Sequence, residues 1–250
     1  MKNGTYESFN FVHIPKCGGT SFRKLLNQTA HENNVSENEL YIVGCNGIPN
    51  EKNISQLSED DVESLNENGL LRVIAGHHKY QEVEKLGIHL KGQTFNYTIL
   101  RDPVSRFISH YNFFHYKLNY HNCKDISLND LEEVKLRKFV KLYANLHIRF
   151  IANVLRPRAV GIDNLIKIAL YNLFHEFGAF GVLEHPIESQ KWLHDSSPEW
   201  LTVRGALPEY NKNKMEMSIN PERLAIIKEG NQADCEFYEK AKKYLLDKMS

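Results

Sequence analysis

Two kinds of hydrophobic pattern alternate along the chain. Short continuous apolar runs predict buried strands over residues 9–14, 40–43, 70–75, 95–100 and 177–183. Apolar residues spaced three or four positions apart predict helices over residues 20–30, 103–116, 128–155, 163–175, 187–194 and 221–248. Strands that alternate with helices in this way are typical of an α/β domain with a mainly parallel sheet.

Local capping residues add one helix to this set and refine the start of another. Residues 46–69 are polar and rich in Asn, Glu and Ser. Within them we expect a solvated helix over 58–65, because Ser58 and Asp61 have the spacing of a capping box. Pro103 suits the first position of the helix that follows the fourth strand, where a missing N–H costs nothing.

Composition adds limits to this picture. The chain has 250 residues without an internal repeat or a long Gly/Ser linker, so we expect one domain over residues 1–250. The 31 basic and 31 acidic residues cancel, and no overall field draws the protein to nucleic acid. An anionic substrate must therefore be held by a local basic patch. The first 30 residues lack a long apolar run, so no membrane segment is predicted.

The segment Phe11–Phe22 has the chemistry of a phosphate cradle. It reads FVHIPKCGGTSF, an apolar strand that enters a polar turn and then a helix. The small residues of the turn let backbone N–H groups approach an anion, and the start of the helix adds a favourable dipole. The turn consists of Lys16, Cys17, Gly18, Gly19, Thr20 and Ser21.

A second segment, Tyr97–Tyr111, repeats this arrangement of strand, turn and helix. Its strand ends at Arg101, and its helix carries Ser109 one to two turns along. In parallel sheets, ligands bind beyond the carboxyl ends of the strands. Four polar residues fall at or after predicted strand ends, and we expect them to converge in space: Lys16, His77, Arg101 and Glu184.

Together the two segments resemble the donor-binding elements of sulfotransferases that use 3′-phosphoadenosine 5′-phosphosulfate (PAPS), especially carbohydrate sulfotransferases of the heparan sulfate type. In that family a PK-x-(G/A)-(G/S)-T-S turn holds the 5′-phosphosulfate, and an R-D-P-x-x-R-x-x-S segment holds the 3′-phosphate. Both patterns occur here in the expected order. The resemblance implies a P-loop-like, three-layer α/β fold. Residues 112–175 match no element of that family, and we expect them to form a helical insertion that shapes the acceptor site.

The resemblance also implies roles for individual residues. Lys16 would neutralise charge on the leaving 5′-phosphate, and Cys17 through Ser21 would supply backbone amides and hydroxyls. Arg101 and Ser109 would bind the 3′-phosphate, and Arg106 would support the loop. Lys212, in a late polar loop, would touch the phosphates of the donor or of its product, PAP.

A histidine is the expected general base, because a neutral imidazole suits removal of a hydroxyl proton near pH 7. Gly76-His77 directly follows a predicted strand and resembles the family segment that bears the catalytic histidine. His78 is its neighbour, and the sequence leaves an exchange of roles open. Glu184 is the alternative base or an orienting partner.

The expected acceptor is a hydroxyl group, most naturally on a carbohydrate. A tyrosyl peptide and a small alcohol remain alternatives, as does a glycan-binding protein without activity. A P-loop kinase fits less well, because Lys16 precedes the glycines instead of following them. No zinc-type spacing occurs, and no metal site is expected. The four cysteines are interpreted as free thiols, without sequence support for a Cys45–Cys123 bridge. The protein is expected to be cytoplasmic and bacterial-like, unless it is a trimmed form of an anchored Golgi enzyme.

Overall fold

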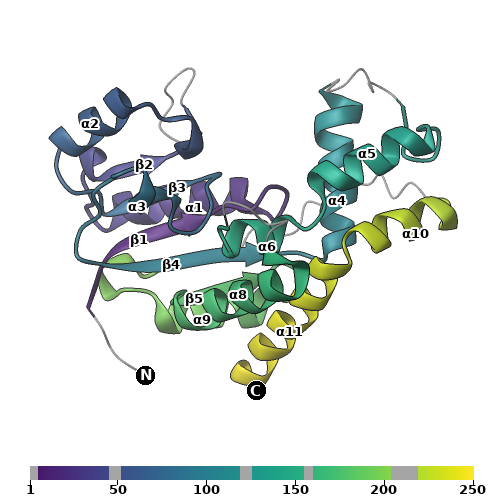
Figure 1. Ribbon diagram of the computed structural model, residues 1–250. Helices are drawn as coiled ribbons and strands as arrows, with labels where there is room; N and C mark the ends of the chain where they lie inside the picture. The colour runs from purple at the N-terminus through teal and green to yellow at the C-terminus, as the bar shows by residue number, and fades with distance from the viewer. Residues whose placement is uncertain (1–4, 45–51, 119–125, 155–159, 204–218) are drawn as a thin grey trace.

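A computed structural model describes residues 5–44, 52–118, 126–154, 160–203 and 219–250 of the protein (Figure 1). Within these residues five strands form one parallel sheet in the order β2-β3-β1-β4-β5. The strands are β1 (Tyr6–Val12), β2 (Leu40–Ile42), β3 (Val73–Gly76), β4 (Gln93–Leu100) and β5 (Ala179–Val182). The predicted α/β fold with a parallel sheet is confirmed.

Helices follow each strand and cover the sheet. They are α1 (Gly19–Glu32), α2 (Glu59–Glu67), α3 (Glu82–Lys85), α4 (Pro103–Tyr111), α5 (Glu133–Tyr143), α6 (Leu146–Ile151), α8 (Ile162–His175), α9 (Pro186–Ser196), α10 (Pro221–Gly230) and α11 (Gln232–Met249). Short 3₁₀ turns cover Glu37–Glu39, Ile54–Gln56 and Glu199–Leu201. The predicted cap of α2 is present, since the Ser58 side chain accepts a hydrogen bond from the Asp61 N–H.

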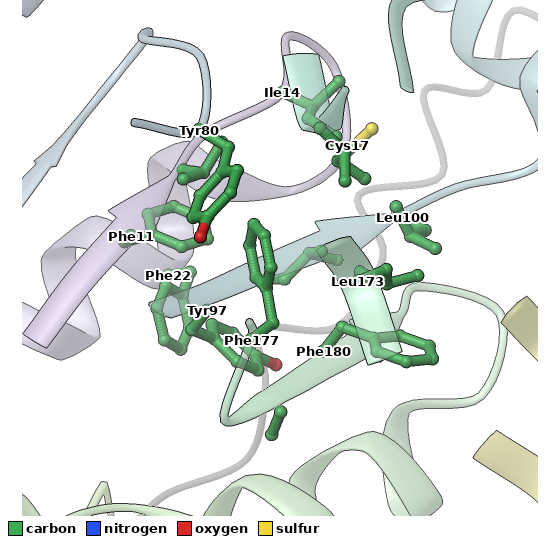
Figure 2. Packing of buried hydrophobic residues seen from close by; sticks show 14 of the residues in the cluster. Phe11, Ile14, Cys17, Phe22, Tyr80, Tyr97, Leu100, Leu173, Phe177 and Phe180 are labelled. Atoms are coloured by element: carbon green, nitrogen blue, oxygen red, sulfur yellow. The ribbon is translucent and has the colours of Figure 1, made fainter. Parts of the chain in front are cut away.

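The main core is built around the two central strands, β1 and β4. Phe11 and Tyr97 are register partners on these strands, and both rings pack on Phe22 of α1 (Figure 2). The opposite face carries a polar pair, in which the Asn10 amide donates to Asn96 over 2.9 Å. From Ser8 onward β1 is buried on both faces, and its buried polar side chains, Ser8 and Asn10, are hydrogen-bonded to Thr94 and Asn96 of β4.

A smaller second core lies beyond the carboxyl ends of the strands, where α4, α5 and α10 stand together (Figure 1). Phe107 and Tyr111 of α4 pack there with Phe139 of α5 and Ile227 of α10. By contrast, α6 and α8 belong to the main core. Within residues 112–175, the helices that the structure describes are thus divided between two cores.

Two predicted helices are each broken in two. Residues 128–155 break between α5 and α6, where Asn145 takes a left-handed φ of 55°, and 221–248 break at Asn231. Hydrogen bonds join the two break points. The Asn145 side chain donates to the Gly230 carbonyl over 2.9 Å and accepts from the Asp234 N–H over 3.0 Å. These bonds replace helical ones that each break gives up.

The helix expected over 103–116 also changes character. It is α-helical to Tyr111 and continues as a π-helical turn, η3, over Asn112–Lys117. Single π-helical turns are uncommon and often occur at functional sites. No helix within the described ranges is both long and apolar enough to span a membrane.

Candidate functional site

The turn after β1 has the backbone shape of an anion-binding cradle. Lys16 and Gly18 have left-handed φ angles of 69° and 81°, whereas Cys17 between them does not. This alternation directs neighbouring N–H groups into one concavity. The Cys17 N–H, which we expected to join them, instead donates to the Ile14 carbonyl over 3.3 Å. The turn leads directly into α1, whose first N–H groups, at Gly19, Thr20 and Ser21, have no carbonyl of a preceding helical turn to bind. The donor set suits a phosphate or sulfate group.

Close packing fixes the glycines of this turn. A Cβ on Gly19 would lie 2.0 Å from the His13 ring, and one on Gly18 would lie 3.0 Å from the Leu183 side chain. His13 is buried, so its ring has little room to move. The cradle is therefore held against the ends of both β1 and β5.

Arg101 joins the two predicted anion-binding segments. Its Nη1 donates a hydrogen bond of 3.0 Å to the main-chain carbonyl of Lys16, and the Arg101 side chain is largely buried. The contact lies directly after β4, next to the strand that carries the turn. The structure thus brings Lys16 and Arg101 to the same sheet edge, as the sequence predicted.

The other residues of the second segment differ in placement. Ser109 lies one turn after Ser105 on α4 and is half-buried. Arg106 is fully buried, and its Nη2 donates to the Tyr143 carbonyl over 2.6 Å. Burial lowers the pKa of Arg106, while the Asp234 carboxylate opposes this effect. Arg106 therefore connects α4 to the end of α5 and supports the segment from below.

His77 lies beside the turn, stacked on His13. The ring centroids are 4.0 Å apart, and His77 Nδ1 lies 2.9 Å from the His13 carbonyl. A carbonyl only accepts, so this contact assigns the proton to Nδ1 and leaves the lone pair on Nε2. Burial lowers the pKa of His77, and the Arg23 and Lys16 cations lower it further, against the hydrogen bond to His13. His77 is therefore neutral at pH 7.

The two alternative bases have other contacts. His78 is fully buried, with Nδ1 3.0 Å from the Gly76 carbonyl and Nε2 2.8 Å from Asn10 Oδ1. Glu184 accepts from the Asp102 N–H over 2.9 Å and from the Tyr238 hydroxyl over 2.8 Å. The described hydrogen bonds of both residues are thus with parts of the fold outside the cradle. Glu184 instead ties the end of β5 to the start of α4 and to α11.

The Lys16 ammonium rests over an aromatic ring. Its Nζ lies 4.1 Å from the centroid of Phe113, which belongs to the π-helical turn and is 38% exposed. Cation–π contacts of this kind at exposed sites contribute about 0.5–1 kcal/mol. The π-helical turn therefore lies at the mouth of the cradle.

A buried histidine that the sequence did not single out touches both anion-binding segments. His147 Nε2 lies 3.5 Å from Cys17 Sγ and 3.4 Å from the Arg101 nitrogen, whose N–H points at it. On its other side, Nδ1 lies 3.0 Å from Asp234 Oδ2. Burial lowers the pKa of His147, but the carboxylate of Asp234 outweighs this effect and raises it. In the sequence, Asp234 lies within the helix predicted over residues 221–248.

A cavity lies elsewhere in the fold. It has a volume of about 960 Å³ and is bounded by α5, α6, α8 and α10, with Leu142, Ile148 and Ile162 in its wall. It contains none of the predicted site residues, so the cradle is the better candidate site. Within the described ranges, no group of three or more His, Cys, Asp or Glu side chains is arranged to hold a metal ion. Lys212, Cys45 and Cys123 lie outside the described residues.

Comparison with known proteins places this geometry in context. A family model described as the sulfotransferase family matches residues 3–241. That range contains the whole sheet, the cradle and both segments joined by Arg101. A search of curated proteins found no match.

Proposed function

Since the chain belongs to the sulfotransferase family, we propose that it transfers the sulfuryl group of PAPS to a hydroxyl group of a carbohydrate. The match covers nearly the whole chain, so sulfuryl transfer is the activity of the domain itself. The donor, the acceptor and the residue roles below are our proposals.

The contact between Arg101 and the Lys16 carbonyl is the observation that carries the proposal. It places a buried guanidinium beside the N–H groups of the cradle, and so prepares one site for two separate anionic groups. PAPS has two such groups, a 3′-phosphate and a 5′-phosphosulfate. We assign the former to Arg101 and Ser109, and the latter to the cradle and its side chains.

Lys16 is the group we place on the leaving side. Bound PAPS supplies an activated sulfuryl group and a phosphate leaving group. As the bond between sulfur and the bridging oxygen breaks, its electron pair stays on that oxygen, where the Lys16 ammonium stabilises the charge. Charge stabilisation of this kind commonly provides the largest part of catalysis in group transfer.

His77 is the group we place on the attacking side. Its Nδ1 proton is held by the His13 carbonyl, so Nε2 carries the lone pair that can take the hydroxyl proton as the new oxygen–sulfur bond forms. The lowered pKa keeps this nitrogen unprotonated at neutral pH. The contacts of Glu184 and His78 favour positioning roles for both of them.

The carbohydrate acceptor is supported by the exposed ring at the mouth of the cradle. Phe113 lies next to the Lys16 ammonium and presents a partly exposed face. Aromatic rings of this kind pack well against the apolar faces of sugars. By contrast, His110 and Tyr111, earlier on the same helix, are buried in the smaller core or at its edge.

Calorimetric titration tests the donor. Purified protein is titrated with PAP, with 5′-AMP and with ATP in the presence of a chelator. We expect PAP to bind in the micromolar range and 5′-AMP much more weakly, because only PAP engages Arg101. Equal binding of PAP and 5′-AMP, or tighter binding of ATP once Mg²⁺ is added, would overturn the proposed donor and favour a kinase.

An acceptor screen with PAPS tests the rest. Oligosaccharides, a tyrosyl peptide and simple alcohols are offered at equal hydroxyl concentration, and sulfated product is measured by mass. We expect turnover of a carbohydrate in chelator. Turnover of the peptide or alcohol alone would replace the carbohydrate, and donor binding without turnover of any acceptor would point to a binding protein.

A further inference from the structure

We propose that His147 is a positioning residue that fixes the spacing between the two anion-binding segments, and that Asp234 holds its ring in place. The proposal rests on the proposed function, because it assigns one phosphate of the donor to each segment. It concerns residues that do not touch the donor themselves. Cys17 contributes the contact through which the cradle meets this ring.

The His147 ring bridges the two segments by direct contact. Its Nε2 lies 3.5 Å from Cys17 Sγ in the cradle and 3.4 Å from the backbone nitrogen of Arg101. Cys17 lies between the two left-handed residues of the cradle, and Arg101 is the first residue after β4. A shift of this ring would therefore move both segments.

Asp234 fixes the ring from behind. One of its carboxylate oxygens lies 3.0 Å from His147 Nδ1 and accepts from the His147 N–H over 3.0 Å, and the other accepts from the Ile148 N–H over 3.0 Å. The carboxylate thereby caps the start of α6 and holds the histidine ring with the same group. Cys17, His147 and Asp234 are all buried.

The Asp234 carboxylate has two cationic partners within the protein. Asp234 faces His147 and lies near the Arg106 guanidinium, and these two partners hold the pKa of the carboxyl below its ordinary value against the effect of burial. A carboxylate without such partners would be costly to bury. The network is thus a stable support beneath the cradle, out of reach of substrate.

A positioning role predicts a specific pattern of ligand affinities. PAP carries both phosphates, whereas adenosine 5′-phosphate and adenosine 3′-phosphate each carry one. If the segments are correctly spaced, PAP binds more tightly than the separate affinities of the two monophosphates imply. We call this gain the bisphosphate advantage. It is the ratio of the Kd of the tighter-binding monophosphate to the Kd of PAP, and it depends on the distance between the segments.

The test compares His147→Leu, His147→Gln and Asp234→Asn with the natural protein. Affinities for PAP and both monophosphates are measured by calorimetry, with competition against PAP for weak ligands. We expect His147→Leu to reduce the bisphosphate advantage at least about tenfold, because small displacements have effects of that size. We expect His147→Gln to restore most of it, since an amide can reach the position of Nε2. Asp234→Asn should fall between them.

Leu173→Ala is the matched control for lost stability. Leu173 is buried in the main core on α8, and its apolar side chain forms no hydrogen bond to the backbone of either anion-binding segment. We expect it to lower the Tm without changing the bisphosphate advantage. If His147→Leu folds, lowers all three affinities by the same factor and resembles Leu173→Ala, the positioning role is wrong.

These outcomes separate the inference from the proposed function. If the natural protein shows no bisphosphate advantage, the proposed donor is wrong. If it shows one that His147→Leu retains, the donor stands and the inference fails. If His147→Leu does not fold, the bisphosphate advantage of His147→Gln and of Asp234→Asn tests the inference instead. In these variants we expect the KM for PAPS to change more than kcat.

Discussion

The His13 and His77 rings stack on each other with centroids 4.0 Å apart, and the His13 carbonyl accepts a hydrogen bond of 2.9 Å from Nδ1 of His77. One residue thus orients the proposed base through both its ring and its backbone. The same His13 ring fills the space beside Gly19, so the proposed base and the cradle share one support. Several measurable consequences arise from this arrangement.

The pH dependence of catalysis should reflect the lowered pKa of His77. Burial, Arg23 and Lys16 favour the neutral ring. A general base works only when unprotonated, so kcat/KM should rise with pH through a midpoint below 6.5 and be constant at neutral pH. Rates measured from pH 4.5 to 8 with saturating PAPS provide the check. His77→Gln should lose most activity. It should also lose the fall in kcat/KM at acid pH, which we call the acid limb, and an unchanged acid limb would assign the base to another residue.

Gly19→Ala should disturb both the fold and the base. The new Cβ would lie 2.0 Å from the His13 ring, which has no free space to enter. Overpacking of this kind commonly costs about 1–3 kcal/mol, measurable by urea unfolding. Gly69→Ala is the control, because its Cβ meets nothing within 4 Å and only its positive φ is affected. Only Gly19→Ala should shift the acid limb, and equal profiles for both variants would contradict the shared support.

Lys16→Ala should lower kcat by about 100- to 1,000-fold, the usual cost of losing one group that stabilises transition-state charge. The Tm should change little, because Lys16 is only partly buried. Lys24→Ala removes an exposed lysine from α1 and should leave kcat within about twofold, as expected for a surface substitution. A similar kcat for Lys16→Ala and the natural protein would remove Lys16 from the leaving side.

Phe113→Leu should weaken acceptor binding. It removes the exposed ring but keeps an apolar side chain, and loss of an aromatic contact worth about 0.5–1.5 kcal/mol raises KM roughly two- to tenfold. Phe113→Tyr keeps the ring and should behave like the natural protein. Initial rates at varied carbohydrate concentration distinguish the two. Equal KM values for both variants would place the acceptor away from the π-helical turn.

His78 should make the folded state sensitive to acid. Burial lowers its pKa to about 3, against the hydrogen bond to Gly76, whereas the unfolded chain titrates near 6.5. The unfolded state therefore binds more protons between these values, and stability falls as pH falls from 6.5 towards 3. Glutamine cannot titrate, so the free energy of unfolding of His78→Gln should fall less steeply as the pH is lowered. Its slope should be smaller than that of the natural protein by about 1.4 kcal/mol per pH unit. Parallel curves from urea unfolding at pH 4.5 to 6.5 would contradict this.

The parts of the site that the sequence predicted are local in character. The cradle follows from Lys16, Gly18 and Gly19 at the end of an apolar run, and the convergence of Lys16 with Arg101 follows from the rule that parallel strands end at the same edge. His77 was found for the same reason. Each of these inferences needed only the order of strands and the residues directly after them.

The parts that could not be predicted depend on contacts between distant segments. The break at Asn145 exists because its side chain binds Gly230 and Asp234, and an apolar pattern carries no trace of that partner. His147 looked like any other polar residue in a helix until the fold placed it against Cys17 and Arg101. The π-helical turn likewise had no distinct pattern, because its 6 residues are too few to show a period of their own.

The contact between Asp234 and His147 has a consequence for the order in which the protein can be completed during synthesis. Every strand of the sheet precedes α11 in the chain, so the sheet can pair before the carboxylate that caps α6 has been translated. Until α11 docks, the support beneath the cradle lacks its anchor. A nascent chain can therefore have a complete sheet before the proposed donor site is fully supported.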